Sequence, residues 1–301
     1  MKNTNTLDKK KSFYKQWFIW GILFIVPFLF YPWALNASWV SNSDVHSLLE
    51  FCAAIIALIT AAVVLTHFFV TGRKFFLLIS LGFTLQGAED LVHAIYSFSR
   101  IWPTERIGIL NFVPGTYVTG RLLLVFCFIL AFYREKKGLV TKNRTKEAIS
   151  YNTVGFFIAA IATLIIINSP LPKFILPGQI ISRPVDFIAA LIYLFSFLCF
   201  VKMYRQEKYH TPFVWSLTAS LIFGFITQAY MIHSQQLYDA QFDISHLLKI
   251  FSYIFPIGGI AVGTFVMYKK EATLRKALDE KTTELIQEVS ERKQAESDIG
   301  M

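Results

Sequence analysis

Long apolar stretches alternate with short polar segments along most of this chain. A helix that crosses a bilayer needs about 20 predominantly apolar residues, and eight stretches approach or exceed that length. They are Trp17–Leu35, Ser47–Val70, Phe75–Phe98, Tyr117–Tyr133, Tyr151–Asn168, Asp186–Val201, Phe213–His233 and His246–Tyr268. The pattern predicts an all-α fold, a polytopic membrane helix bundle of about eight spans.

The composition agrees with a location in the lipid bilayer. Of the residues, 54% are hydrophobic and only 16% are charged, whereas an ordinary soluble domain carries about 25% charged residues. The formal charge of +9 would suit a nucleic-acid-binding protein if the basic residues formed one patch. They do not form one patch, because they alternate between the two ends of the spans.

The distribution of Lys and Arg predicts the orientation in the membrane. Most of them fall in residues 9–11, 73–74, 134–146, 202–208 and from 269 onward, whereas the other connections hold only Arg100, Arg106, Lys173 and Arg183. Basic residues accumulate in cytoplasmic loops. We therefore expect a multi-pass protein of the bacterial inner membrane with both termini in the cytoplasm and no nucleic-acid partner.

The chain turns hydrophilic after the last apolar stretch and keeps a helical pattern. A heptad pattern runs through Leu278, Thr282, Leu285, Val289, Arg292 and Ile299, which is about three heptads of a coiled coil with one charged residue in the seam. Neither Gly nor Pro occurs between Tyr268 and Ile299, so the last span can continue into this tail as one helix. The alternative is a solvated charged helix that pairs with nothing.

The run Leu285-Ile-Gln-Glu-Val-Ser-Glu-Arg-Lys-Gln-Ala-Glu resembles the signalling helix that precedes PAS, histidine-kinase or diguanylate-cyclase modules in bacterial receptors. The resemblance implies a parallel homodimer through the C-terminal helix and a cytoplasmic output of one of those three kinds. We therefore divide the chain into a cytoplasmic N-terminal segment (1–16), a membrane sensor domain (17–268) and a cytoplasmic signalling helix or coiled coil (269–301).

Polar side chains inside the spans gather in the half that faces outward. An ionisable side chain near the bilayer centre costs about 2.5–3.5 kcal/mol on insertion scales, so such residues mark functional sites. Ten residues at this level are candidate ligand-binding residues: His46, Glu50, Gln86, Glu89, Asp90, His93, Arg121, Asp243, His246 and Lys249. Asp186, Gln228 and His233 lie at the same level. We expect these groups to line a pocket that opens toward the periplasm.

Helical spacing pairs several of these side chains. His46 and Glu50 are four residues apart, as are Glu89 and His93, and residues at that spacing share one face of a helix. Imidazoles and carboxylates together suit a metal ion. The sequence therefore makes His46, Glu50, Glu89 and His93 candidate metal ligands, with a small polar solute as the other candidate ligand.

A purely structural interpretation stands beside the functional one. Arg121 can neutralise Asp90 or Glu89, because a buried charge needs a partner. Each histidine near the interface can likewise satisfy the carbonyl groups of a loop. Such pairing does not exclude contact with a ligand.

Residues from about 45 to 267 resemble the third family of bacterial membrane-associated sensor (MASE) domains. The matching pieces are His46-Ser-Leu-Leu-Glu50, Asp90-Leu-Val-His93, Arg121, Ser245-His246-Leu-Leu-Lys249 and Tyr253. The family commonly has an Asn and a Gly-His pair where this chain has Asp243 and Ser245-His246. The resemblance implies a non-catalytic sensory input domain of a signal-transduction receptor, with its output module outside this chain.

Two other classes of protein compete with a sensor. A small-solute or cation permease would use a helix break near mid-depth, and Pro256 with Gly258-Gly259 could break the last span. A membrane-embedded metalloenzyme could be built on the His and Glu pairs, although no H-E-x-x-H motif is present. The charges near one face favour the sensor.

Overall fold

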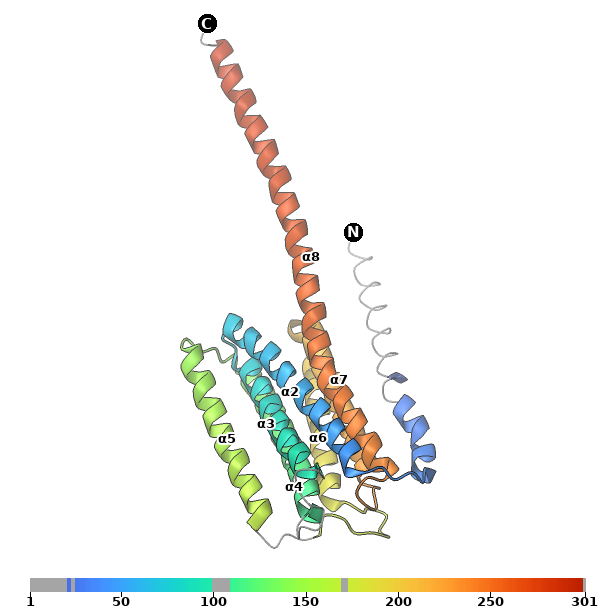
Figure 1. The fold of residues 1–301 in the computed structure, drawn as a ribbon. Helices are drawn as coiled ribbons and strands as arrows, with labels where there is room; N and C mark the ends of the chain where they lie inside the picture. The colour runs from blue at the N-terminus through green and yellow to red at the C-terminus, as the bar shows by residue number, and fades with distance from the viewer. Residues whose placement is uncertain (1–20, 23–24, 99–108, 169–172, 300–301) are drawn as a thin grey trace.

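The computed structural model describes residues 21–22, 25–98, 109–168 and 173–299. Its long helices are α2 (Ser43–Thr71), α3 (Lys74–Ser97), α4 (Ile109–Lys136), α5 (Arg144–Asn168), α6 (Pro184–Tyr204), α7 (Pro212–Met231) and α8 (Ala240–Ile299), with a short 3₁₀ helix, η1, at Glu207–Tyr209. Two isolated β-bridges are the only extended pairing in these ranges. The predicted all-α membrane bundle is confirmed (Figure 1).

Seven of the described helices are long and apolar enough to cross a membrane. They correspond to the last seven of the eight predicted stretches. The first predicted stretch, Trp17–Leu35, falls partly outside the described residues, and most of its described part belongs to a shorter apolar helix, Ile25–Asn36. Consecutive helices run up and down, so the ends that face one membrane surface alternate along the sequence (Figure 1).

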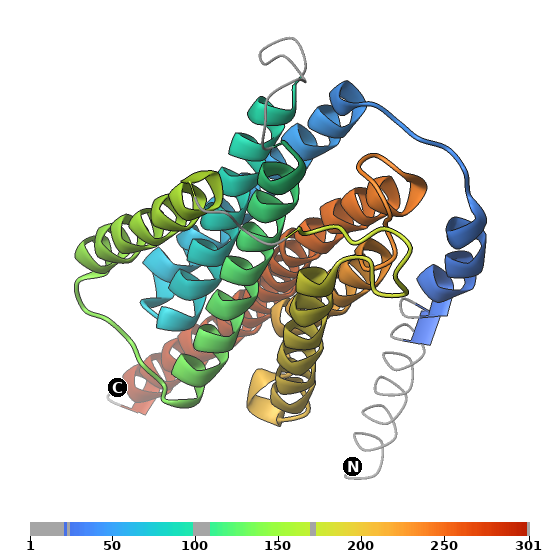
Figure 2. The same ribbon diagram turned by 90° about the horizontal axis from the view of Figure 1, so that it is seen from below.

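The helices differ in how far they are enclosed. Helices α3, α4 and α7 are the most buried, whereas most of the surface of α5 is exposed. In Figure 2, α5 and the helix Ile25–Asn36 lie at opposite edges of the bundle. Exposed apolar side chains such as Phe157 on α5 and Phe195 on α6 suit contact with lipid, which offers no polar partners.

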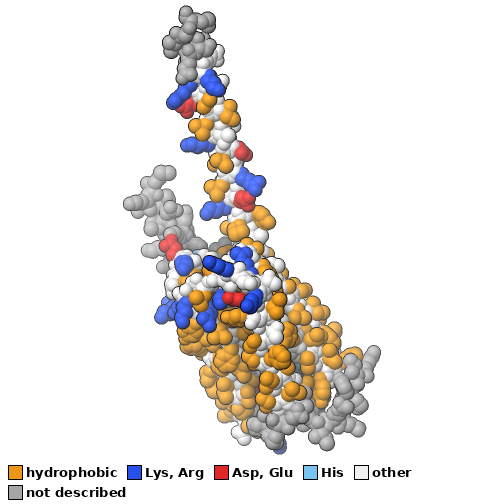
Figure 3. Space-filling view, turned by 90° about the vertical axis from the view of Figure 1, so that its left-hand side faces the viewer, with side chains coloured by type: hydrophobic (Ala, Val, Ile, Leu, Met, Phe, Trp, Pro, Cys, Tyr) orange, Lys and Arg blue, Asp and Glu red, His pale blue; other side chains and the backbone are white. Residues whose placement is uncertain are grey.

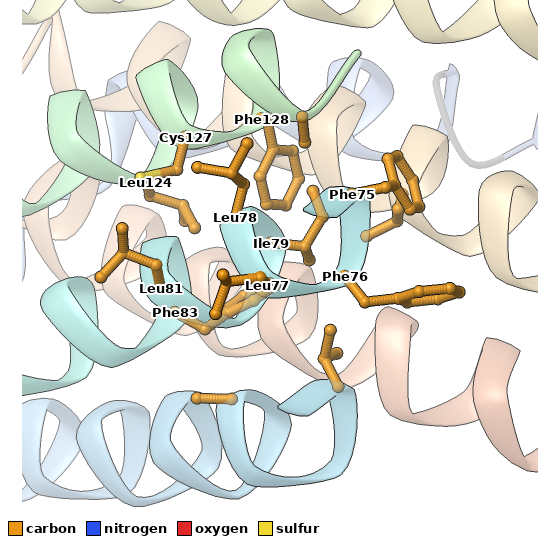
Figure 4. Packing of buried hydrophobic residues seen from close by; sticks show 14 of the residues in the cluster. Phe75, Phe76, Leu77, Leu78, Ile79, Leu81, Phe83, Leu124, Cys127 and Phe128 are labelled. Carbon is orange, nitrogen blue, oxygen red and sulfur yellow. The ribbon is translucent and has the colours of Figure 1, made fainter. Parts of the chain in front are cut away.

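One half of the bundle has an apolar core. The first half of α3 packs its side chains against the second half of α4, where Phe83 and Phe128 form an edge-on pair with ring centroids 5.6 Å apart (Figure 4). Leu124 and Cys127 pack in the same layer. The polar residues occupy the opposite half, at the end where α2, α4, α6 and α8 begin. The bundle therefore has an apolar core at one end and its polar residues at the other.

Helix α8 is a single helix of 60 residues, about 90 Å long at 1.5 Å per residue. It continues through Pro256, so the break near Pro256 and Gly258-Gly259 that the permease alternative would use is absent. A proline inside a spanning helix is tolerated when its neighbours satisfy the freed carbonyl groups. The last part of α8 stands clear of the bundle (Figure 1), and Lys and Arg side chains gather where it leaves (Figure 3).

Candidate functional site

Helix α2 supplies two residues of the polar end. The helix starts after Asn42, whose side chain accepts hydrogen bonds from the backbone N–H groups of Asp44 and Val45. This N-cap fixes the first turn, and therefore the face that His46 and Glu50 share. Both side chains are fully buried.

Three histidines and one carboxylate converge at this end. His93 lies near the end of α3 and His246 near the start of α8, and the Nε2 atoms of His46 and His93 are 2.7 Å apart. Nε2 of His246 lies 2.9 Å from Oε1 of Glu50. One ligand atom from each of the four residues lies within 4.8 Å of every other. We call these four residues the His-Glu cluster.

The outer nitrogens of two imidazoles are held by neighbouring groups. Nδ1 of His246 lies 2.7 Å from the carbonyl oxygen of Phe242, and Nδ1 of His93 lies 2.9 Å from Oγ1 of Thr116. The Thr116 hydroxyl donates to the carbonyl oxygen of Phe112, so it accepts from His93. Both Nδ1 atoms therefore carry the hydrogen, by assignment from their partners, and both Nε2 lone pairs point into the cluster.

A buried ammonium group sits beside the His-Glu cluster. Nζ of Lys249 lies 2.6 Å from each carboxylate oxygen of Glu50 and 3.1 Å from Oδ1 of Asp90. Asp90 also accepts hydrogen bonds from the Gln86 amide and the Tyr253 hydroxyl. Helices α2, α3 and α8 thus meet through one ion-paired network, in which each charged group has a partner as burial requires.

Arg121 belongs to a neighbouring layer, which Tyr253 links to the first because its ring lies 6.0 Å from the guanidinium and its hydroxyl donates to Asp90. Its guanidinium donates to the carbonyl oxygen of Gly224 and lies 4.5 Å from the ring centre of Tyr193. With its amide oriented as its neighbours require, Gln228 accepts from Arg121 and donates to Asp186 at 2.8 Å. Gln228 therefore bridges the guanidinium to a buried carboxylate.

The suggested pairing of Arg121 with Asp90 or Glu89 is wrong. Asp90 pairs with Lys249, and Glu89 turns toward α5, where it accepts a hydrogen bond from the Thr163 hydroxyl at 2.9 Å. Helical spacing placed Glu89 on the face of His93, but a side chain at that position can turn toward either neighbouring helix. His246 takes the place in the converging group that spacing suggested for Glu89.

The other candidate polar residues lie farther from the His-Glu cluster. Asp243 accepts hydrogen bonds from Ser41 and Trp39, so it ties the segment before α2 to the start of α8. Nδ1 of His233 is hydrogen-bonded to the Tyr31 hydroxyl, and His233 is not part of the His-Glu cluster. Arg183, which charge counting assigned only to an outer loop, is buried against Ser234, and this burial lowers the pKa of its guanidinium.

Two contributors escaped sequence reasoning. Thr116 was not singled out, because a Thr inside a span usually bonds to a carbonyl one turn earlier and gives no further signal. Tyr193 lies in an apolar stretch and likewise carries no sequence signal. Tyr253 entered only through the resemblance to a family.

The fold and this network define a polytopic α-helical membrane protein with a polar centre buried in one half of its bundle. A family model described as a membrane-associated sensor domain, MASE3, matches residues 37–266. Because this match covers most of the chain, the chain belongs to the MASE3 family, and the expected family is confirmed. No curated protein and no solved structure matches the chain. The domain is therefore a membrane-associated sensory input domain.

Proposed function

We propose that this domain binds a metal ion or small ligand at its buried polar centre and transmits that event along α8 to a cytoplasmic output module. The observation that carries the proposal is the position of three residues on α8. His246 belongs to the His-Glu cluster, Lys249 pairs with Glu50 and Asp90, and Tyr253 donates to Asp90. They are spaced at i, i+3 and i+7, which is one face of one helix.

The mechanism follows from the balance of charge at this face. A ligand shifts a conformational equilibrium only if it interacts differently with the two states. Binding beside Glu50 changes how strongly that carboxylate holds Lys249, and Lys249 is fixed to α8. The shift therefore acts directly on the helix that leaves the bundle.

The exposed stripe on the tail supports a second copy of this chain as the first partner. Leu278, Leu285 and Val289 are more than half exposed in the single chain, and they follow the heptad spacing that predicts a two-stranded coiled coil. A PAS, histidine-kinase or diguanylate-cyclase module is the proposed output. The bacterial inner membrane with both termini in the cytoplasm is the proposed location, supported by the Lys and Arg residues where α8 leaves the bundle.

A chimera tests the transmission step. The tail is joined in heptad register to a diguanylate cyclase, and cyclase output is measured in membranes with equal amounts of each variant. Tyr253→Phe removes only the hydroxyl that donates to Asp90, and we expect it to change the basal output. Tyr268→Phe, on the exposed surface of the same helix, is the matched control.

A second pair of variants tests whether the projecting part of α8 transmits the signal. Inserting seven residues after Tyr268 preserves the heptad phase, whereas inserting four rotates everything beyond the insertion. We expect the first insertion to retain regulated output and the second to lose or invert it. Unchanged output in both Tyr253→Phe and the four-residue insertion would exclude α8 as the transmitting element.

A further inference from the structure

We propose that His46, His93, His246 and Glu50 bind one divalent first-row transition-metal ion of the zinc or ferrous type. The inference rests on the proposed function and deepens it, because it names the chemical class of the ligand at the same centre. Imidazole nitrogen with one carboxylate oxygen is a donor set that suits these ions. Sequence spacing alone suggested a different set, with Glu89 in place of His246.

The spacing of the donor atoms fits a metal centre. Bonds from zinc to nitrogen or carboxylate oxygen are about 2.0–2.2 Å, so neighbouring donors in a tetrahedral site lie roughly 3.3 Å apart. Two pairs are already near this spacing: His46 with His93 at 2.7 Å, and His246 with Glu50 at 2.9 Å. The whole set falls within 4.8 Å. Small side-chain movements therefore complete the coordination, without a change in the helices.

The imidazoles are presented as metal ligands usually are. A metal-bound histidine generally donates its other ring N–H to a carbonyl oxygen or a similar acceptor, which fixes the ring and its tautomer. His246 does so through Phe242, and His93 through Thr116. Each of these supports comes from the first turns of a helix, α8 and α4, so the bundle itself orients the rings.

A cation would satisfy the contact between His246 and Glu50. In the neutral imidazole with the hydrogen on Nδ1, Nε2 of His246 presents a lone pair to a carboxylate oxygen 2.9 Å away, and in this form the two atoms make no hydrogen bond. Two acceptors that face each other in a buried site are unfavourable. Either a proton on Nε2 or a metal ion that both atoms ligate removes this conflict, and the metal is the alternative we propose.

The net charge of the ion-paired network beside the His-Glu cluster also favours a bound cation. The charged groups that face one another here are Glu50 from α2, Asp90 from α3 and Lys249 from α8. With the imidazoles neutral, each charged group has a partner, but two carboxylates against one ammonium still leave a net negative charge, and unbalanced buried charge is costly. Glu89 lies outside the network because it bonds to Thr163. A bound cation offsets the excess, while Lys249 limits how far Glu50 can move.

Metal content tests the inference without any measurement of signalling. The full chain is purified in detergent without an affinity tag that binds metal, and is analysed by elemental mass spectrometry after chelation and reloading with Zn²⁺ or Co²⁺. We expect about one metal per chain, with visible d–d bands in the cobalt form. His46→Gln and His246→Gln should lose stoichiometric metal. His67→Gln, on the same helix as His46 but at the other end of the bundle, should keep it.

A second variant separates coordination from folding. Thr116→Val removes only the acceptor that orients His93, and loss of such a support weakens metal affinity by about 10–100-fold.

Added Zn²⁺ should raise the unfolding temperature of the unmodified chain and of His67→Gln, but not of His46→Gln. A chain that folds and retains no stoichiometric metal, or retains it equally in His46→Gln, would overturn the inference.

The two proposals fail in different ways. If hydrogen bonds hold the His-Glu cluster together without a metal ion, no metal is retained. The chimera of the previous section then still responds to Tyr253→Phe. If the metal serves only the fold, metal is retained and the unfolding temperature depends on it. Cyclase output then stays the same in the metal-loaded and metal-depleted chimera.

Discussion

Lys249 on α8 donates to both carboxylate oxygens of Glu50 on α2 at 2.6 Å, across 199 positions of sequence. Both side chains are fully buried. The pair fixes the beginning of the projecting helix to the second helix of the chain, at the level where the three histidines converge. Any change in charge at Glu50 therefore acts on α8 through its contacts with Lys249 and His246.

Removal of this ammonium should destabilise the bundle. Lys249→Met leaves the carboxylates of Glu50 and Asp90 buried without their cation, and breaking a buried pair in this way costs about 3–5 kcal/mol. The free energy of unfolding in detergent measures the loss. Lys202→Met, at an exposed position on α6, should stay within about 0.5 kcal/mol. Equal stability of Lys249→Met and Lys202→Met would contradict the role of the pair.

Arg121 and Glu89 should act independently. Arg121→Met removes the buried guanidinium that Gln228 links to the carboxylate of Asp186, whereas Glu89→Gln keeps an oxygen that accepts from Thr163. We therefore expect a large loss of stability for the first variant and a small one for the second. The double variant should equal their sum within about 0.5 kcal/mol. Recovery in the double variant would instead show that the two groups pair.

The close approach of α7 to Arg121 depends on a glycine. A Cβ atom at Gly224 would lie 2.3 Å from the Tyr193 ring, so Gly224→Ala must displace that ring and the guanidinium beside it. Overpacking of this kind costs about 1–3 kcal/mol. Gly258→Ala is the matched control, because a Cβ atom there meets nothing within 4 Å. Thermal unfolding in detergent should separate the two variants.

The tail should pair with its own copy in parallel. A cysteine at Leu285, in the predicted seam, should form a symmetric disulfide under mild oxidation, and a cysteine at Glu284 should do so much less. Both native side chains are exposed in the single chain, so exposure alone does not favour either position. Equal crosslinking at the two positions would indicate an unpaired, solvated helix.

Fusions to topology reporters test the orientation. Reporters placed after Lys146 and Lys208 should show cytoplasmic activity, and those after Arg106 and Ser182 should show periplasmic activity. The reason is the concentration of Lys and Arg in the first pair of connections. Arg106 lies outside the described residues. A cytoplasmic result there would contradict the order of spans.

The sequence by itself determined the class of fold. Apolar length and the placement of Lys and Arg predict spanning helices and their direction, because the bilayer imposes these requirements on each segment separately. The same local reasoning paired His46 with Glu50, since residues four apart share a helix face. It also predicted one helix from the last span into the tail, and α8 is that helix.

The tertiary structure alone decided which polar groups meet. Spacing within α3 could not tell that Asp90 turns toward Lys249 while Glu89 turns toward Thr163, because adjacent residues on a helix differ in direction by about 100°. Nor could it place His246 beside Glu50 or Thr116 behind His93, since those contacts depend on which helices pack together. Sequence periodicity fixes a face of a helix, and only packing determines what that face meets.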